Sequence, residues 1–193
     1  IYPDISFQTI TGIGGAFNEI GGEALMSLSE AQQNDIMKNL FDKNAANFTV
    51  CRTAIGSSDF GIDAYSYSEV PKDYKMKKFS IERELSSVIP YIKMAYKYKP
   101  DMELFASPWS PPSWMKVSGL MDRGEEFPEK NILIDDPKIY KAYALYFSKY
   151  VKAYAKEGIS VDKIVIQNEQ DISTKYPSCH MPPKQMGEFV INY

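Results

Sequence analysis

Residues 47–55 read NFTVCRTAI, a short run of β-branched and apolar residues that is typical of a buried strand. Similar runs follow at 103–107 (ELFAS) and 163–167 (KIVIQ), and residues 9–15 favour a further strand near the start. Amphipathic segments separate these runs from one another. A strand and a helix that alternate four times along the chain predict a parallel sheet with helical crossover connections.

Capping residues mark where several helices begin and end. Ser29 and Gln32 form a capping box that opens a helix to about residue 40. Asp136 caps another helix, with Pro137 at its first position and Gly158 as its stop signal. A last helix starts near residue 183 and still continues at residue 193. The predicted apolar side of the helix after Asp136 consists of Tyr143, Phe147, Tyr150 and Tyr154.

A further helix is predicted over residues 80–98, with Ser80 as its cap. Glu82 and Glu84 suit its first turn, where the helix dipole favours carboxylates. Its expected apolar stripe repeats at three- and four-residue spacing and consists of Ile81, Leu85, Val88, Ile92 and Ala95.

Two architectures fit this alternation, an open doubly wound sheet and a (β/α)8 barrel. Four strand–helix units make half of such a barrel, and the last helical pattern reaches residue 193 without a stop signal. We therefore expect the chain to be a fragment of a larger protein.

The composition excludes several function classes. The net charge of −3 gives no general attraction to nucleic acid or to an anionic membrane. His180 is the one histidine, and Cys51 and Cys179 lie in no metal-binding spacing, so we expect neither a metal nor another cofactor. The sequence contains no transmembrane run. It opens at Ile1 without methionine, which favours a secreted or periplasmic protein whose leader was removed.

The stretch 12–22, GIGGAFNEIGG, raises the question of a phosphate-binding loop. Gly12 and Gly14 fit the first two positions of a G-x-G-x-x-G motif, but Phe17 stands at the third. A P-loop is excluded because the stretch holds no lysine. The glycines therefore need another explanation.

Polar and aromatic residues gather where the predicted strands end, which is where active residues sit in both architectures. Arg52 and Asp59 span the end of the second strand and could form a structural ion pair or bind polar ligand groups. Trp109 and Trp114 flank a proline-rich loop after the third strand. Each could pack in the core or hold its indole face against a sugar ring.

Glu169 is the strongest single candidate for catalysis. It follows the apolar run IVIQ, so we expect it at the end of a buried strand, where desolvation suits a carboxyl group to general acid catalysis. Asn168 beside it can bind a hydroxyl group. The alternative is an Asn-Glu pair that simply begins a polar loop. A carboxylate, an amide and an indole at neighbouring strand ends suit carbohydrate chemistry better than phosphate or hydride transfer.

Four blocks now point to a family, because they stand in order at family-like distances: GIGGAFNEIGG, RTAIGSSDF, ASPWSPPSWMK and VIQNEQD. Together they resemble glycoside hydrolase family 30, the glucosylceramidase family, from residue 7 to about residue 189. The resemblance implies a (β/α)8 barrel, with residues 1–193 forming the N-terminal part of the catalytic domain, strands one to four. The β-sandwich that usually accompanies this barrel would lie mostly outside the chain.

The resemblance also implies roles for individual residues. Glu169 matches the general acid/base, and Asn168 matches the residue that hydrogen-bonds the sugar's 2-hydroxyl. Asp59 and Trp109 match residues that line the glycone subsite, and Arg52 matches an arginine that braces the catalytic carboxylates. The glycine block would end the first barrel strand and let the backbone turn sharply beneath the sugar pocket.

The implied reaction is retaining hydrolysis of β-glucosides or glucosylceramide-like substrates by double displacement. A carboxylate nucleophile, about 5–5.5 Å from the acid/base, would attack the anomeric carbon while Glu169 protonates the leaving oxygen. The nucleophile would follow the seventh strand, so the chain alone is expected to be inactive. The expected partners are a carbohydrate substrate and the remainder of the barrel.

One departure bears on the substrate. Many members have proline after the Asn-Glu pair, where this sequence has Gln170 and then Asp171. This position lies on the leaving-group side, and the segment 176–180 (YPSCH) would help to form the entrance. β-Xylosides, β-fucosides and β-1,6-glucans therefore remain alternative substrates, and a non-catalytic glycan-binding relative remains an alternative function.

Overall fold

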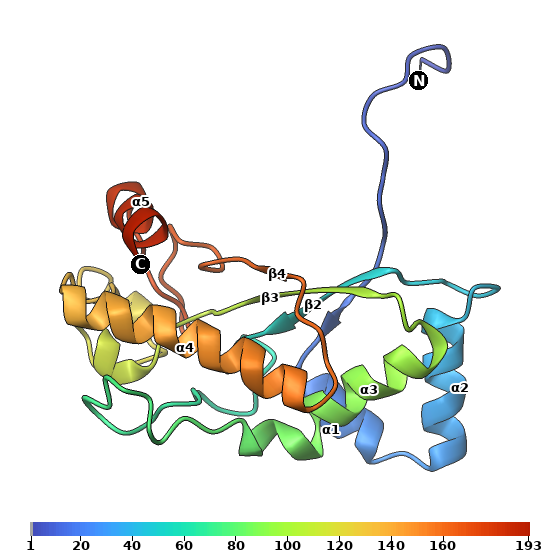
Figure 1. Ribbon diagram of the computed structural model, residues 1–193, viewed down its shortest axis with the longest axis horizontal. Helices are drawn as coiled ribbons and strands as arrows, with labels where there is room; N and C mark the ends of the chain where they lie inside the picture. The colour runs from blue at the N-terminus through green and yellow to red at the C-terminus, as the bar shows by residue number, and fades with distance from the viewer. Residues whose placement is uncertain (1) are drawn as a thin grey trace.

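The computed structural model describes residues 2–193 and contains a sheet of four parallel strands. Neighbouring strands in the sheet are neighbours in the chain, so the order is sequential. Figure 1 shows these strands side by side. They are β1 (Ala16–Phe17), β2 (Val50–Ala54), β3 (Glu103–Ser107) and β4 (Lys163–Ile164).

Helices cover one face of this sheet. Figure 1 shows α1 to α4 on the same side of the strands, and α5 packs beside α4 through Phe189 on Tyr143, with 5.5 Å between ring centroids. A doubly wound sheet carries helices on both faces, so this arrangement favours the barrel. The helices are α1 (Glu19–Met26), α2 (Glu30–Phe41), α3 (Val88–Tyr98), α4 (Pro137–Lys156) and α5 (Pro183–Asn192), with short 3₁₀ helices η1 (Glu82–Ser86), η2 (Ser113–Met115) and η3 (Gly124–Glu126).

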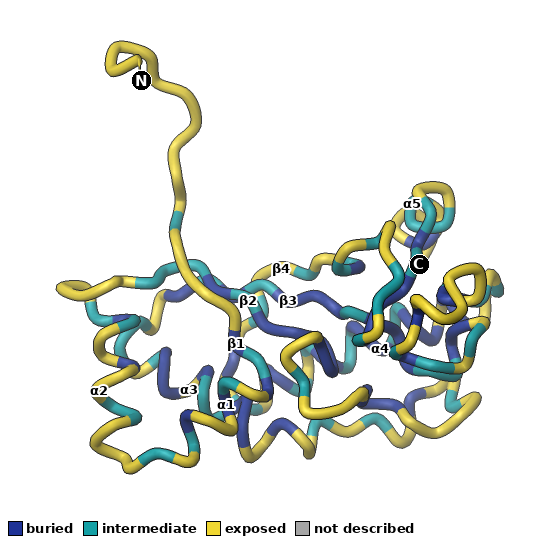
Figure 2. The backbone as a smooth tube through the Cα atoms, turned by 180° about the vertical axis from the view of Figure 1, so that it is seen from behind, coloured by how far each residue is buried: buried dark blue, intermediate teal, exposed yellow. Residues whose placement is uncertain are grey.

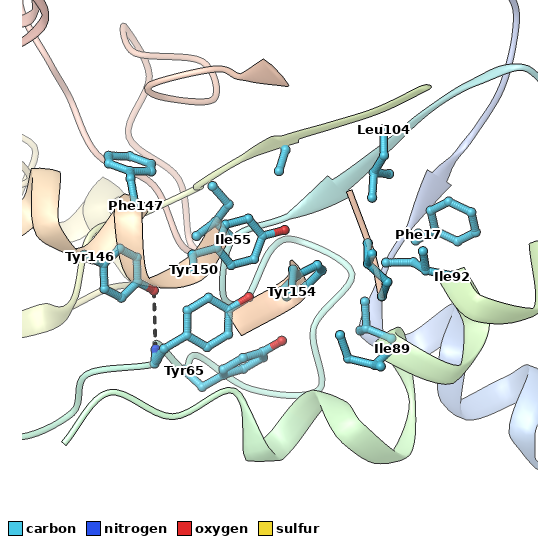
Figure 3. Packing of buried hydrophobic residues seen from close by; sticks show 14 of the residues in the cluster. Phe17, Ile55, Tyr65, Ile89, Ile92, Leu104, Tyr146, Phe147, Tyr150 and Tyr154 are labelled. Carbon is cyan, nitrogen blue, oxygen red and sulfur yellow. Dashed lines mark hydrogen bonds between the residues drawn. The ribbon is translucent and has the colours of Figure 1, made fainter. Parts of the chain in front are cut away.

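The core lies between the sheet and the helices. On β2 and β3, buried Cys51, Leu104 and Ala106 alternate with half-buried residues that face away from the core. The predicted aromatic side of α4 is confirmed, and Figure 3 shows the rings of Tyr146 and Tyr150 beneath the strands. This alternation puts the next residue of β2, Arg52, on the face that the helices leave uncovered.

Most of the predicted helix boundaries are confirmed. Ser29 and Gln32 form the capping box at the start of α2. Asp136 caps α4, its Oδ1 accepting a hydrogen bond from the Lys138 amide at 2.6 Å. Gly158 follows α4 with a φ of +78°, a conformation that favours glycine. Among the described residues, no helix is both long enough and apolar enough to cross a bilayer.

The first strand is displaced from its predicted position at 9–15. It forms at Ala16–Phe17, and Figures 1 and 2 show the preceding residues leaving the body of the molecule as an exposed segment. The glycines there do not make the expected sharp turn, since neither Gly12 nor Gly14 has a positive φ. Instead they permit close approach to β2. A Cβ on Gly14 would lie 1.9 Å from the Val50 carbonyl oxygen.

The helix predicted over 80–98 is divided in two. The α-helical part begins only at Val88, and η1 precedes it. Pro90 explains the break, because a proline in the interior of a longer helix would lack a hydrogen-bonding N–H and clash with the preceding turn. Two side chains consequently differ from expectation. Leu85 is exposed, whereas Glu84 is buried in the core and does not cap a helix in solvent.

Helix α1 was not predicted, because two adjacent glycines disfavour a helix. Asn18 caps it, its Oδ1 accepting a hydrogen bond from the Gly21 amide at 2.8 Å. Gly22 is required by packing, since a Cβ there would lie 2.8 Å from the carbonyl carbon of Ser87. The second half of the glycine block therefore lets α1 press against the start of α3.

Candidate functional site

A cleft of about 310 Å³ lies at the ends of the strands. Residues that follow all four strands line it, although they are far apart in the sequence. Five of the candidates from the sequence are among them: Arg52, Asp59, Trp109, Asn168 and Glu169, whereas Trp114 is not. Parallel pairing produces this meeting, because it brings the C-terminal ends of consecutive strands to one edge of the sheet.

Arg52 is the centre of the hydrogen bonding in the cleft. Its Nε donates to the hydroxyl of Ser107 at 2.9 Å, and its Nη2 donates to the same oxygen and to Asn168 Oδ1, the latter at 2.7 Å. One guanidinium therefore joins the ends of β2 and β3 to the segment that follows β4. Burial lowers the pKa of Arg52 from its ordinary value, and the negative charges of Asp59 and Glu169 oppose this effect.

Asp59 and Arg52 do not form the structural ion pair that their sequence spacing allowed. No contact between their charged groups occurs among the ion pairs of residues 2–193. Asp59 is exposed in the loop after β2 and lines the cleft. Its carboxylate is thus available to a ligand.

The two tryptophans have different surroundings. Trp109 lines the cleft, and the guanidinium carbon of Arg52 lies 4.4 Å from the centre of its ring, a cation–π contact. Trp114 packs against the core, where its Nε1 donates to the Ser68 carbonyl at 2.8 Å and Tyr74 contacts its ring edge-on. Trp114 is therefore a core-packing residue, whereas Trp109 lies beside the possible ligand site.

Glu169 and Asn168 are coupled through their side chains. The Asn168 amide accepts from Arg52 through Oδ1 and donates from Nδ2 to Glu169 Oε2 at 3.2 Å, so its orientation is fixed from both ends. Glu169 has a φ of +44°, in the left-handed region that few residues other than glycine adopt. This turn occurs where the chain leaves the sheet and enters the cleft.

The buried strand that should precede Glu169 is shorter than predicted. β4 ends at Ile164, and Val165 is 43% exposed, because β4 is an edge strand. Glu169 is itself exposed, so the desolvation expected for it is not provided by this chain. A carboxylate at an uncovered sheet face remains in contact with water.

Several residues in or next to the cleft were not singled out as candidates from the sequence. Ser107, the acceptor for Arg52, is buried at the end of β3 and does not line the cleft itself. Phe60 stands beside Asp59 and is 57% exposed, and an aromatic residue in a polar loop could have indicated a ligand contact from the sequence. Tyr176 lines the cleft as well, where segment 176–180 was expected at the entrance. Within residues 2–193, no three potential ligands gather to hold a metal ion.

A larger cavity of about 540 Å³ lies elsewhere, between the N-terminal part of α4 and α5, and Tyr140, Gln185 and Tyr193 are among its lining residues. It contains none of the candidate residues. The chemistry-bearing side chains are concentrated in the smaller cleft.

Comparisons with known proteins bear on the family and the fold of the chain. Residues 10–182 match the family model described as the glycosyl hydrolase family 30 TIM-barrel domain. The chain is 37% identical over 193 residues to "putative glucosylceramidase 3" of Caenorhabditis elegans. The matched region covers 97% of this chain and 36% of the relative.

Two solved structures are similar in fold. SrfJ from Salmonella typhimurium gives a TM-score of 0.88 at 30% identity, with 96% of this chain and 40% of that chain covered. An endo-β1,6-glucanase gives 0.82 at 26% identity, with 98% and 41% covered. The chain thus spans about two fifths or less of the length of these proteins.

Proposed function

Because the chain belongs to glycosyl hydrolase family 30 and has the fold of half a TIM barrel, we propose that it supplies the sugar-binding and acid/base half of a retaining β-glycosidase. The observation that carries this proposal is the hydrogen-bonded series Ser107, Arg52, Asn168 and Glu169 along the strand ends. It aligns a carboxylate, an amide and a guanidinium in one cleft. No phosphate-binding loop competes with it.

In this proposal Glu169 is the general acid/base. In the first step it protonates the glycosidic oxygen as the bond to the anomeric carbon breaks, while a carboxylate nucleophile bonds to that carbon. In the second step Glu169 takes a proton from water, which displaces the nucleophile and releases the sugar. The nucleophile would follow a strand of the barrel outside these residues, so the isolated chain should not turn over.

Asp59 and Trp109 would recognise the glycone. The Asp59 carboxylate accepts hydrogen bonds only, which suits sugar hydroxyl donors. The guanidinium of Arg52 contacts the half-buried indole of Trp109 and limits its movement. The Asn168 amide would meet the 2-hydroxyl next to the reacting carbon, and Arg52 would hold both that amide and the charge of Glu169 in place.

We propose a β-linked glucose unit as the glycone. The nematode relative carries the name of a glucosylceramidase and one similar structure that of a β1,6-glucanase, and both names refer to glucose. Glucosides or glucosylceramide-like molecules are the first candidates. β-1,6-Glucan is the second, supported by the TM-score of 0.82 to the glucanase. In this proposal Gln170, the residue after Glu169, would lie on the side of the departing group.

The test is hydrolysis of aryl β-glucoside, β-xyloside, β-galactoside and β-fucoside by the full-length protein, beside its Glu169→Gln variant. We expect turnover of one sugar and a loss of about 10²–10⁴-fold in the variant, the usual contribution of general acid–base catalysis. The loss should be smaller for an aryl group that leaves without protonation.

Glu23→Gln is the matched control, since Glu23 is exposed on α1 away from the cleft. It should retain normal turnover. Near-normal turnover by Glu169→Gln would refute the acid/base assignment. Sugar binding without turnover by the unaltered protein would favour the glycan-binding alternative.

A further inference from the structure

Glu19 is a buried carboxylate outside the set described above. It stands in the first turn of α1 and is only 6% exposed. Its Oε1 accepts a hydrogen bond from Arg83 Nε at 2.7 Å, and its Oε2 accepts one from the Ile62 amide at 2.8 Å. Burying a carboxylate costs free energy unless donors replace water. Here the two donors come from two separate segments, so the side chain links three parts of the chain.

One of these segments is the loop 58–63, which carries Asp59 and Phe60 to the cleft. The loop has little apolar packing to hold it, because Phe60 is 57% exposed and Ile62 is 62% exposed. Its base is closed by hydrogen bonds between Ser57 and Tyr65.

The tip of this loop is attached to the first turn of α1 by two hydrogen bonds. The Ile20 amide donates to the Phe60 carbonyl at 3.1 Å, and the Ile62 amide donates to Glu19. The attachment points lie one and three residues after Asp59. The direction of the Asp59 side chain therefore depends on α1.

Arg83 ties the far end of the loop to the same carboxylate. While its Nε binds Glu19, its Nη2 lies 2.6 Å from Asp63 Oδ1. Its guanidinium carbon lies 4.1 Å from the centre of the Tyr65 ring. Glu19 and Arg83 thus hold the adjacent residues Ile62 and Asp63 at the end of the loop, and neither side chain lines the cleft.

We propose that Glu19 is a positioning residue for glycone recognition, which acts by fixing the loop 58–63 so that Asp59 and Phe60 face the cleft. The assignment of a sugar as the ligand rests on the proposed function. The link between Glu19 and the loop does not. Without the two oxygens of the Glu19 carboxylate, either the Ile62 amide or Arg83 loses its acceptor, and the loop samples other arrangements, most of which withdraw Asp59 from the ligand.

Glu19→Gln in the full-length protein tests this on the best aryl glycoside. We expect KM to rise about tenfold, as for the loss of a charge-assisted hydrogen bond, with a change in kcat below about threefold. In an Asp59→Ala background the same substitution should change KM less than about twofold, because the residue that it positions is already absent. Glu23→Gln, on the same helix but exposed, is the matched control and should change neither constant.

A merely structural role predicts a different pattern. It would lower the melting temperature and the active fraction while KM stays unchanged, or would act equally in both backgrounds, and either result overturns the proposal. Glu19→Asp guards against a failure to fold, because it keeps the negative charge near Arg83 while one methylene fewer shortens the reach of the carboxylate to Ile62. It should raise KM in the same direction.

Hydrogen exchange at the Ile62 amide separates this proposal from the proposed function. Exchange should be at least about tenfold faster in Glu19→Ala, which leaves that amide without a side-chain acceptor, than in the unaltered protein, whether or not any glycoside is hydrolysed. Equal exchange rates overturn the positioning role. Absence of turnover in the unaltered protein, with faster exchange in the variant, overturns the glycosidase assignment and leaves the link between Glu19 and the loop in place.

Discussion

Replacing Glu84 by glutamine should remove much of the pH dependence of stability in this part of the protein. The carboxylate is 1% exposed in the core, where Oε1 accepts hydrogen bonds from the hydroxyls of Tyr65 at 2.8 Å and Tyr67 at 2.7 Å, and Oε2 accepts one from Tyr154. Burial raises the pKa of Glu84 to about 7 from its ordinary value of 4.5, although the three hydroxyls favour the charged form.

The size of the effect follows from this difference. A carboxyl group with a pKa of about 7 when folded and 4.5 when unfolded gives about 3 kcal/mol, at about 1.4 kcal/mol for each tenfold change in proton affinity. The folded state binds the proton more tightly, so this stabilisation is fully present below pH 4.5 and is lost as the pH rises through 7. Glutamine is neutral at every pH and should not show that loss.

The assay is denaturant unfolding at pH 4.5 and pH 7.5. We expect the unaltered protein to lose about 3 kcal/mol more than Glu84→Gln between these conditions. Glu82→Gln, which removes an exposed carboxylate from the same 3₁₀ helix, is the matched control and should behave like the unaltered protein. An equal pH dependence in Glu84→Gln and the unaltered protein would refute the reasoning.

Two matched pairs of substitutions give further predictions. Trp109→Ala should weaken sugar binding with little loss of melting temperature, because Trp109 lines the cleft. Trp114→Ala should cost about 3 kcal/mol of stability, because its ring packs on the core. Binding titration and thermal unfolding distinguish the two variants, and a reversed pattern would exchange the roles of the two tryptophans. Gly22→Ala should destabilise by about 1–3 kcal/mol, since its Cβ would meet the backbone of Ser87 at 2.8 Å. Gly187→Ala, in α5 with open space around it, should stabilise by up to about 1 kcal/mol, and equal effects of the two in urea unfolding would contradict the packing argument.

The parts of the fold that were predictable are those with strong local signals. The capping box at Ser29, the Asp136 cap with Pro137 and the apolar run of β3 depend on residues that are neighbours in the chain, and the structure confirms all three. The family resemblance is confirmed in the same way, because its four blocks could be compared position by position. Caps and short apolar runs are predictable because the contacts that they make lie within one or two turns of the chain.

Errors arose where a distant contact decides the local structure. The glycines of 12–22 were interpreted as a turn, but Gly14 and Gly22 serve close approach to Val50 and Ser87, which lie 36 and 65 residues further along the chain. Glu84 was assigned to the first turn of a helix, yet it is enclosed by tyrosines from two other segments.

The sequence by itself determined which residue types stand at the strand ends, and so which chemistry the cleft can offer. The candidates Arg52, Asp59, Trp109, Asn168 and Glu169 were all identified from the sequence, because they follow its predicted strands. Only the tertiary structure decided how they are connected. Arg52 reaches Asn168, 116 positions away, and Glu19 reaches Ile62 across 43. A hydrogen bond requires a separation of about 3 Å in space, which spacing along the chain cannot supply and parallel strand pairing can.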